Sequence, residues 1–157
     1  IMMANPQNNV IQQATSNIGY HEGVNNDNKF AATAGHANNQ PWCATFIVAC
    51  FIKAGLVKAI PNSAAVIDFL KWGKTKKQLI DFKQAKAGDL ILFNFTGGTT
   101  PEHIGLAIAD FDQAHSAIIT VEGNTSNGVG SQANGDGVYK RVRPAQFVVA
   151  VVRPLWG

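Results

Sequence analysis

The sequence predicts an α+β domain in which N-terminal helices pack on an antiparallel β-sheet of about five to six strands. Before Gly88, apolar residues recur at helical spacing; after it, short runs rich in Ile, Val and Phe alternate with Gly, Asn, Asp and Pro clusters. With 157 residues, of which 46% are hydrophobic and 15% charged, the chain is too apolar for a disordered segment. We see no repeat or linker, so residues 1–157 are expected to form one domain.

The helical half is punctuated by residues that start or stop helices. Gly19 ends the first periodic segment, and Pro41 and Gly55 bracket the most apolar one, with Pro41 at the first helical position. The Asn- and Gly-rich tract between these segments predicts a loop. We expect helices over residues 8–18, 42–54 and 63–72, and a loop over residues 22–40.

The second half contains short β-branched and aromatic runs separated by turn residues. Consecutive runs of this kind, without helices between them, favour antiparallel pairing. The expected strands are residues 90–94, 103–109, 117–122, 138–142 and 147–153.

The formal charge of +3 comes mostly from scattered Lys and Arg residues. The tight cluster Lys71, Lys74, Lys76 and Lys77 around Trp72 is interpreted as a solvated face rather than a site for a phosphate polymer. No aromatic residues interleave with basic ones on strand-like segments, so we expect no nucleic-acid binding. The longest apolar stretch is far shorter than the ~20 residues that span a bilayer. No secretory signal opens the sequence, which begins Ile-Met-Met-Ala at residues 1–4, and we draw no expectation about export from this end.

The two cysteines are expected to be separate thiols. Cys43 and Cys50 lie seven positions apart in one helix, so their Cα atoms would be about 10 Å apart, which is too far for a disulfide. Cys50 lies among apolar residues and is interpreted as buried. Cys43 lies in the first turn, where free backbone N–H groups stabilise a thiolate, as a nucleophile requires.

A nucleophilic thiol needs a base and a third group that orients the base. Of the four histidines, His21, His36 and His115 fall in polar loops or a turn and are interpreted as exposed bystanders, whereas His103 begins a strand. A hairpin that closes symmetrically on residues 110–115 would set His103 directly opposite Glu122. The alternative is a surface Glu near a surface His.

Four short motifs follow one another along the chain: Trp-Cys-Ala-Thr-Phe at residues 42–46, Ala-Gly-Asp-Leu-Ile-Leu-Phe at 87–93, Glu-His-Ile-Gly-Leu-Ala at 102–107 and Val-Glu-Gly-Asn at 121–124. They resemble the successive motifs of CHAP domains, the cysteine, histidine-dependent amidohydrolase/peptidases of the wider NlpC/P60 and papain-like group. The resemblance extends over most of the chain. It implies a papain-like fold with Cys43 as nucleophile, His103 as base, Glu122 as the residue that orients it, and Asn124 beside the site.

The resemblance also implies a substrate and a setting. Family members cut the stem peptide or cross-bridge of peptidoglycan, as endopeptidases or as N-acetylmuramoyl-L-alanine amidases, and many are phage lysins or bacterial autolysins. We therefore expect a monomeric phage or prophage endolysin domain that acts at the bacterial cell wall without a cofactor, made in the host cytoplasm and released for lysis, or else secreted. Gln40 and Trp42 are candidates to contact the substrate, although Trp42 could equally be a core residue.

Two departures from the family pattern matter. Many members have Gln directly before the catalytic Cys, where this chain has Trp42, and the nearest Gln is Gln40. The upstream tract contains only Asp27 and Glu22 as carboxylates, too few for the usual Ca²⁺ site, so we expect no metal. Two other readings stay open: a wall-binding module without activity, and a zinc site on the three candidate catalytic residues.

Overall fold

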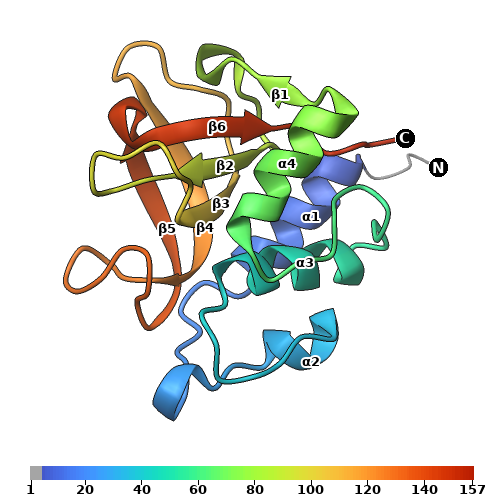
Figure 1. Cartoon of the computed structure of the whole chain (residues 1–157), viewed down its shortest axis with the longest axis vertical. Helices are drawn as coiled ribbons and strands as arrows, with labels where there is room; N and C mark the ends of the chain where they lie inside the picture. Colours follow the sequence, from blue (N-terminus) through green and yellow to red (C-terminus); the bar gives the residue numbers. More distant parts are fainter. Residues whose placement is uncertain (1–4) are drawn as a thin grey trace.

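A computed structural model describes residues 5–157; residues 1–4, part of the stretch searched for a secretory signal, lie outside the described range. Figure 1 shows the sheet on the left and the helices on the right. This arrangement confirms the α+β class and the expected sheet. The helices are α1 (Pro6–Thr15), α2 (Phe30–Ala34), α3 (Cys43–Lys53) and α4 (Val66–Lys76), with short 3₁₀ turns η1 (Val24–Asn26), η2 (Phe82–Gln84) and η3 (Ala145–Phe147). The strands are β1 (Leu79–Ile80), β2 (Leu90–Phe93), β3 (His103–Ala107), β4 (Ala117–Thr125), β5 (Gly137–Pro144) and β6 (Val148–Val152).

All strand pairs are antiparallel, in the order β1-β6-β2-β3-β4-β5. Strands β2, β3 and β4 form the interior of the sheet next to β6 and are almost entirely buried. The five expected strands are present, and β1 is an additional edge strand. Since it has only two residues, it leaves no period-2 pattern in the sequence.

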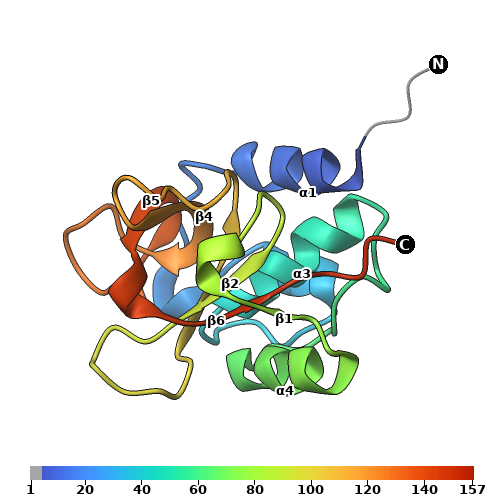
Figure 2. The ribbon, with the colours of Figure 1, turned by 90° about the horizontal axis from the view of Figure 1, so that it is seen from above.

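Helix α3 is the central helix of the domain. Its residues from Cys43 to Phe51 are buried, because a helix that is apolar on all sides must be covered on all sides. It packs against β3 and β4 on one side and against α1 and α2 on others. Figure 2 shows α3 between α1 and α4.

Two expectations about the helices are wrong in detail. Helix α3 begins at Cys43 with Trp42 as its N-cap, so Pro41 lies before the helix rather than at its first position. The tract expected to be loop contains α2, whose residues Phe30, Ala31 and Ala34 are buried. The backbone N–H of Ala31 is bound by the side-chain oxygen of Asn28 at 3.0 Å, which fixes the start of this short helix.

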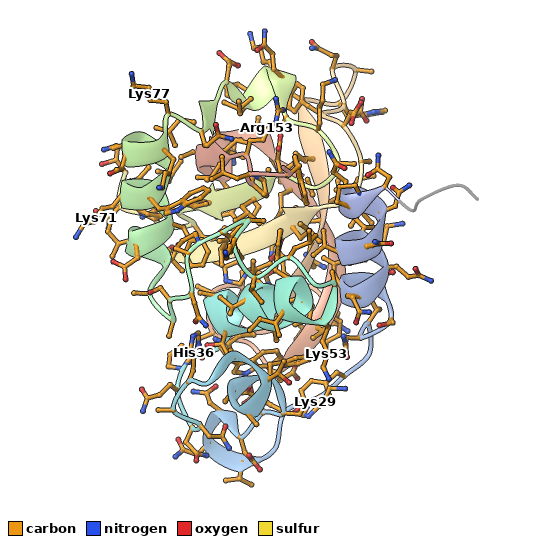
Figure 3. All side chains as sticks on the ribbon, turned by 90° about the vertical axis from the view of Figure 1, so that its right-hand side faces the viewer. Lys29, His36, Lys53, Lys71, Lys77 and Arg153 are labelled. Atoms are coloured by element: carbon orange, nitrogen blue, oxygen red, sulfur yellow. The ribbon has the colours of Figure 1, made fainter. Side chains whose placement is uncertain are left out.

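The basic cluster on α4 is solvent-exposed, as expected for a solvated face. Figure 3 shows Lys71 and Lys77 pointing away from the body of the domain, and Lys74 and Lys76 are exposed as well. None of the helices between residues 5 and 157 is both long and apolar enough to cross a membrane.

Candidate active site

Cys43 is the first residue of α3, and its helix start is uncapped. The N-cap residue, Trp42, offers no side-chain hydrogen bond to the first-turn N–H groups. These groups and the positive end of the helix dipole therefore lie next to the thiol, where they favour negative charge. Cys43 is 5% exposed and is not disulfide-bonded; Cys50 is also free, as expected from the helix geometry.

His103 and Glu122 form a buried hydrogen-bonded pair between β3 and β4. The imidazole Nε2 lies 2.8 Å from Oε1 of Glu122, and neither side chain has any exposed surface. Of the three candidate catalytic residues, solvent reaches only Cys43. The alternative of a surface Glu near a surface His is thus excluded for this pair.

The register that produces this contact differs from the predicted one. Leu106 pairs with Val121 and Ala107 with Thr120, and continuing this register puts Glu122 opposite Gly105 rather than His103. The turn closes further along, at an Asp112–Ala117 bridge, where Asp112 accepts a hydrogen bond from the backbone N–H of His115. A shift of two residues preserves the face of the sheet, so Glu122 still reaches His103, but diagonally.

Gly105 makes room for this diagonal contact. A Cβ atom at this position would lie 2.6 Å from Cγ of Glu122 and 3.3 Å from its Oε2. Any side chain there would displace the carboxylate. The absence of a side chain at Gly105 therefore allows Glu122 to cross β3 and meet His103.

The carboxylate of Glu122 has three protein partners. Besides His103 it accepts hydrogen bonds from Oγ1 of Thr120 at 2.5 Å and from Nε and Nη2 of Arg143 at 2.9 and 2.5 Å. Burial acts to raise the pKa of Glu122, but the hydrogen bonds from Arg143 and His103 outweigh it and lower the pKa to about 2. Glu122 is therefore ionised at any physiological pH. Neither Thr120 nor Arg143 was among the residues expected at the site.

His103 is held in its protonated form by two neighbours. Burial lowers the pKa of His103, but the Cys43 thiol and the Glu122 carboxylate outweigh it and raise the pKa to about 9. The second ring nitrogen, Nδ1, is buried and has no hydrogen-bond partner within the described part of the chain. Since Nε2 is bound to Glu122, Nδ1 is the nitrogen left to exchange a proton with Cys43.

Asn124 lies at a break in the β4–β5 pairing, where the register shifts between Glu122 and Thr125. Its φ of 55° is left-handed, and its buried side-chain Oδ1 and Nδ2 have no partner among residues 5–157. A Cβ at the neighbouring Gly123 would lie 2.6 Å from Cβ of Phe46, which shows how closely this bulge approaches the first turn of α3. The unused amide donor and acceptor of Asn124 thus lie in a strand that packs on the Cys43 helix.

The two candidate substrate contacts have different surroundings. Gln40 is exposed just before α3, and its side chain forms no hydrogen bond with the described residues. Trp42 is only 1% exposed, stacks on Phe30 and donates a hydrogen bond from Nε1 to Glu22 at 2.9 Å. The expectation that Trp42 lines a substrate groove is wrong for this structure, because its ring is enclosed in the core.

The remaining histidines lie outside this cluster. His21 and His115 are exposed and pair with Asp136 and Asp112, in keeping with their interpretation as bystanders. His36 is not a free bystander: its Nδ1 lies 2.8 Å from Oγ1 of Thr45, which links the preceding loop to the first turn of α3. Figure 3 shows His36 between α2 and α3.

No group of three His, Cys, Asp or Glu side chains within residues 5–157 is arranged to hold a metal ion. The zinc interpretation also conflicts with the hydrogen bonds, because Nε2 of His103 and both oxygens of Glu122 are already engaged. The two carboxylates of the tract upstream of Cys43, considered above for a Ca²⁺ site, are both hydrogen-bonded to protein groups. Asp27 accepts a hydrogen bond from Asn38 at 2.6 Å, and Glu22 accepts one from Trp42.

No protein-family model and no curated protein matches the chain, so the likeness to known proteins is structural. The peptidoglycan hydrolase RipB from Mycobacterium tuberculosis superposes with a TM-score of 0.54 at 18% identity, over 98% of this chain and 68% of RipB. The P60 domain of an antigen from M. avium subspecies paratuberculosis superposes with a TM-score of 0.53 at 18% identity, over 94% of this chain and 93% of that domain. A mutated form of the resuscitation promoting factor interacting protein RipA gives 0.50 at 18% identity, over 95% of this chain and 62% of RipA. At these identities the likeness establishes a shared fold, that of NlpC/P60 domains.

Proposed function

We propose that this chain is a peptidoglycan hydrolase that cuts amide bonds by a thiol mechanism. The observation that carries the proposal is the enclosed His103–Glu122 hydrogen bond beside Cys43 at the uncapped start of α3. Cys43 would be the nucleophile, His103 the base and Glu122 the residue that orients His103. Three residues from separate elements in these roles match what acyl transfer requires.

The proposed reaction divides into acylation and hydrolysis. Sγ of Cys43 attacks the amide carbonyl carbon, and the backbone N–H of Cys43 stabilises the oxyanion. The C–N bond breaks as protonated His103 gives its proton to the leaving amine, which leaves a thioester on Cys43. Water then gives a proton to His103 and its oxygen attacks the thioester carbon. The C–S bond breaks, which releases the acid and restores the Cys43 thiolate beside protonated His103.

Two residues support the reaction in this proposal without taking part in bond breaking. Asn124 could supply its unused amide to the substrate or to the oxyanion, because a buried polar group without a partner needs one. Gln40, exposed beside the start of α3, would contact the peptide.

Peptidoglycan is proposed as the substrate on two grounds. The motifs at residues 42–46 and 121–124 resemble those of CHAP domains, and the structural neighbour RipB is described as a peptidoglycan hydrolase. The protein would then act at the bacterial cell wall, either as a phage lysin or as a bacterial autolysin. We propose endopeptidase cleavage of the stem peptide or cross-bridge, and amidase cleavage with the same residues is the alternative.

The test uses two cysteine variants on one helix. Purified wild type, Cys43→Ala and Cys50→Ala are added to peptidoglycan from several bacteria, and turbidity and new free amino groups are followed. We expect wild type and Cys50→Ala to clear the wall and Cys43→Ala to be inactive, because Cys50 lies deep in the core, 2% exposed. Mass spectrometry of the fragments then identifies the bond. Clearing by folded Cys43→Ala would reject the mechanism, and binding without clearing by wild type would support a wall-binding module.

A further inference from the structure

Arg143 on β5 is buried next to the candidate active site. Its side chain is 5% exposed, and it contacts both oxygens of Glu122 through Nε at 2.9 Å and Nη2 at 2.5 Å. Two parallel N–H···O bonds of this kind hold a carboxylate in one plane as well as supplying charge. Oε1 of Glu122 thus lies between Nη2 of Arg143 and Nε2 of His103.

The rest of the guanidinium is also fixed. Nη1 donates to Oε1 of Gln132 at 2.9 Å, and Nη2 also donates to Oγ1 of Thr125 at 3.0 Å. The face of the group lies 4.7 Å from the ring centre of Phe95, within the range of a cation–π contact. Arg143 therefore has little freedom to rotate, and it joins Glu122 to the segment between β4 and β5.

That segment has its own hydrogen bonds around Gln132. Its backbone oxygen accepts from Oγ1 of Thr125 at 2.6 Å, and its Nε2 donates to Oγ of Ser126 at 2.6 Å. In Figure 1 the β4–β5 loop projects from the lower left of the sheet, beyond the end of β4. The hydrogen bonds of Arg143 thus connect the buried carboxylate to the loop that begins directly after Thr125, the last residue of β4.

We propose that Arg143 is a positioning residue of the thiol site, which fixes the carboxylate of Glu122 for His103 and anchors the β4–β5 loop through Gln132. The assignment deepens the proposed function and rests on it. The hydrogen bonds of Arg143 within residues 5–157 go to Glu122, Gln132 and Thr125 and not to the thiol or the imidazole, so it acts through Glu122.

The charges around the pair explain why such a residue is needed. Within the described chain, the groups that face it are the Cys43 thiol from α3, His103 from β3, Glu122 from β4, and Arg141 and Arg143 from β5. A buried carboxylate without its cation would lose much of its preference for the ionised form. Removing a fixed positive charge also raises the pKa of every titrating group nearby, so the reactive thiolate would form only at higher pH.

Arg141 provides a matched control. It lies two positions earlier on the same strand, carries the same charge and forms no hydrogen bond to Glu122. We would therefore compare Arg143→Lys and Arg143→Met with Arg141→Lys and Arg141→Met. The lysine variants keep the charge and remove only the planar fork.

The measurement is the rate of alkylation of Cys43 by iodoacetamide from pH 4 to pH 10, with the modified residue identified by mass spectrometry. We expect the acid limb of the rate profile to move to higher pH by about 1 to 3 pH units in Arg143→Met. At a fixed low pH, each unit of this shift would lower the alkylation rate about tenfold. Arg143→Lys should move less. Arg141→Lys should resemble wild type, and Arg141→Met, which loses a nearby charge but no hydrogen bond to Glu122, should move much less than Arg143→Met. This assay needs no wall substrate, so its outcome does not depend on the substrate proposal.

Activity and folding complete the test. On a soluble wall peptide, Arg143→Met should lower kcat with little change in KM, because the guanidinium is not expected to touch the substrate. If Arg143→Met does not fold, the single Arg143→Lys, which keeps the charge and Glu122, replaces it and should still show a displaced limb. An alkylation profile of folded Arg143→Met or Arg143→Lys identical to that of wild type would overturn the positioning role. Equal shifts in the Arg141 variants would do the same, since they would reduce the effect to net charge.

Discussion

The domain contains two buried carboxylates that are each held by an arginine, and they differ in what else they touch. Asp89 receives two hydrogen bonds from Arg153, both at 3.0 Å, and a third from the backbone N–H of Lys86 at 2.8 Å. Glu122 receives two from Arg143, but its further partners are Thr120 and His103. Both carboxylates are at most 1% exposed. Asp89 closes a turn, whereas Glu122 is hydrogen-bonded to an imidazole.

The difference lies in which groups are left free. The side-chain contacts of Asp89 end in backbone or in Arg153, whose side chain is 30% exposed. One contact of Glu122 leads to His103, whose Nδ1 has no hydrogen-bond partner among residues 5–157. An ion pair whose polar atoms all have hydrogen-bond partners has a structural role. An ion pair that is bonded to an imidazole with one nitrogen unbonded can also take part in proton transfer. The presence of a buried Arg–carboxylate pair is therefore not by itself a sign of an active site.

The largest expected contrast comes from neutralising each carboxylate. Glu122→Gln should lower wall hydrolysis by about 10²- to 10⁴-fold, the usual contribution of acid–base catalysis, because the amide no longer favours protonated His103. Asp89→Asn should keep full activity per folded molecule, because no contact of Asp89 leads to the site. Turnover on a soluble wall peptide, normalised to folded protein by circular dichroism, is the measurement. An active Glu122→Gln would remove Glu122 from the mechanism.

The same two substitutions should also differ in how much they lower the free energy of unfolding. Breaking a buried pair costs about 3–5 kcal/mol, and this range is expected for Glu122→Gln, whereas Asp89→Asn should cost less because Arg153 can turn to solvent. Urea unfolding of both variants tests this order.

A second contrast uses glycines rather than charges. In Gly105→Ala the new methyl group would lie 2.6 Å from Cγ of Glu122, so the carboxylate must shift and activity should fall by about 10²-fold, as for a displacement of about 1 Å in a catalytic group. Gly73→Ala is equally crowded, with its Cβ 2.8 Å from Cδ2 of Leu79, but it lies on α4. Each should cost about 1–3 kcal/mol of stability. Equal activity of the two alanine variants would show that the position of Glu122 is not critical.

A third contrast follows from pH. The folded-state pKa of His103 is raised to about 9, above its ordinary value of 6.5, so its contribution to stability is complete below pH 6.5 and is lost as the pH rises through 9. We expect the free energy of unfolding to fall by up to about 3 kcal/mol over this window, at about 1.4 kcal/mol per unit. His103→Gln should lack this slope, and Asp89→Asn should retain it. A wild-type stability that is flat from pH 6.5 to pH 9 would contradict the ion pair.

Much of the fold and part of the site could be predicted from the sequence. The apolar run of α3 and the β-branched strands are visible in the sequence from their residue spacing. Helix position, strand ends and motif resemblance together predict that Cys43, His103 and Glu122 belong to one candidate site, although their roles stay predictions. The exact register could not be found, because it depends on a turn that closes at Asp112–Ala117. An error of two residues was harmless here, since it keeps side chains on the same face.

Other features were hidden for physical reasons. Arg143 stands in an amphipathic edge strand, where an arginine usually faces water, and only the three-dimensional pairing of β4 with β5 brings it to Glu122. The need of a buried carboxylate for a cation was the one signal that could have suggested it. Trp42 was ambiguous because an aromatic residue beside a nucleophile suits a groove as well as a core, and its packing on Phe30 decides for the core.

The smallest expected effect concerns the two thiols of α3, of which one is expected to be unreactive and the other reactive. Burial raises the pKa of Cys50 to about 12, so it stays protonated and should not react with iodoacetamide in the native state at pH 8. Cys43, at the uncapped helix start and 5% exposed, should take up a single label. Peptide mapping before and after unfolding in urea checks this, with Cys50 labelled only afterwards. Native labelling of Cys50 at a rate similar to that of Cys43 would mean that the core around α3 opens readily, and the reactivity of Cys43 could then not be ascribed to its place beside His103.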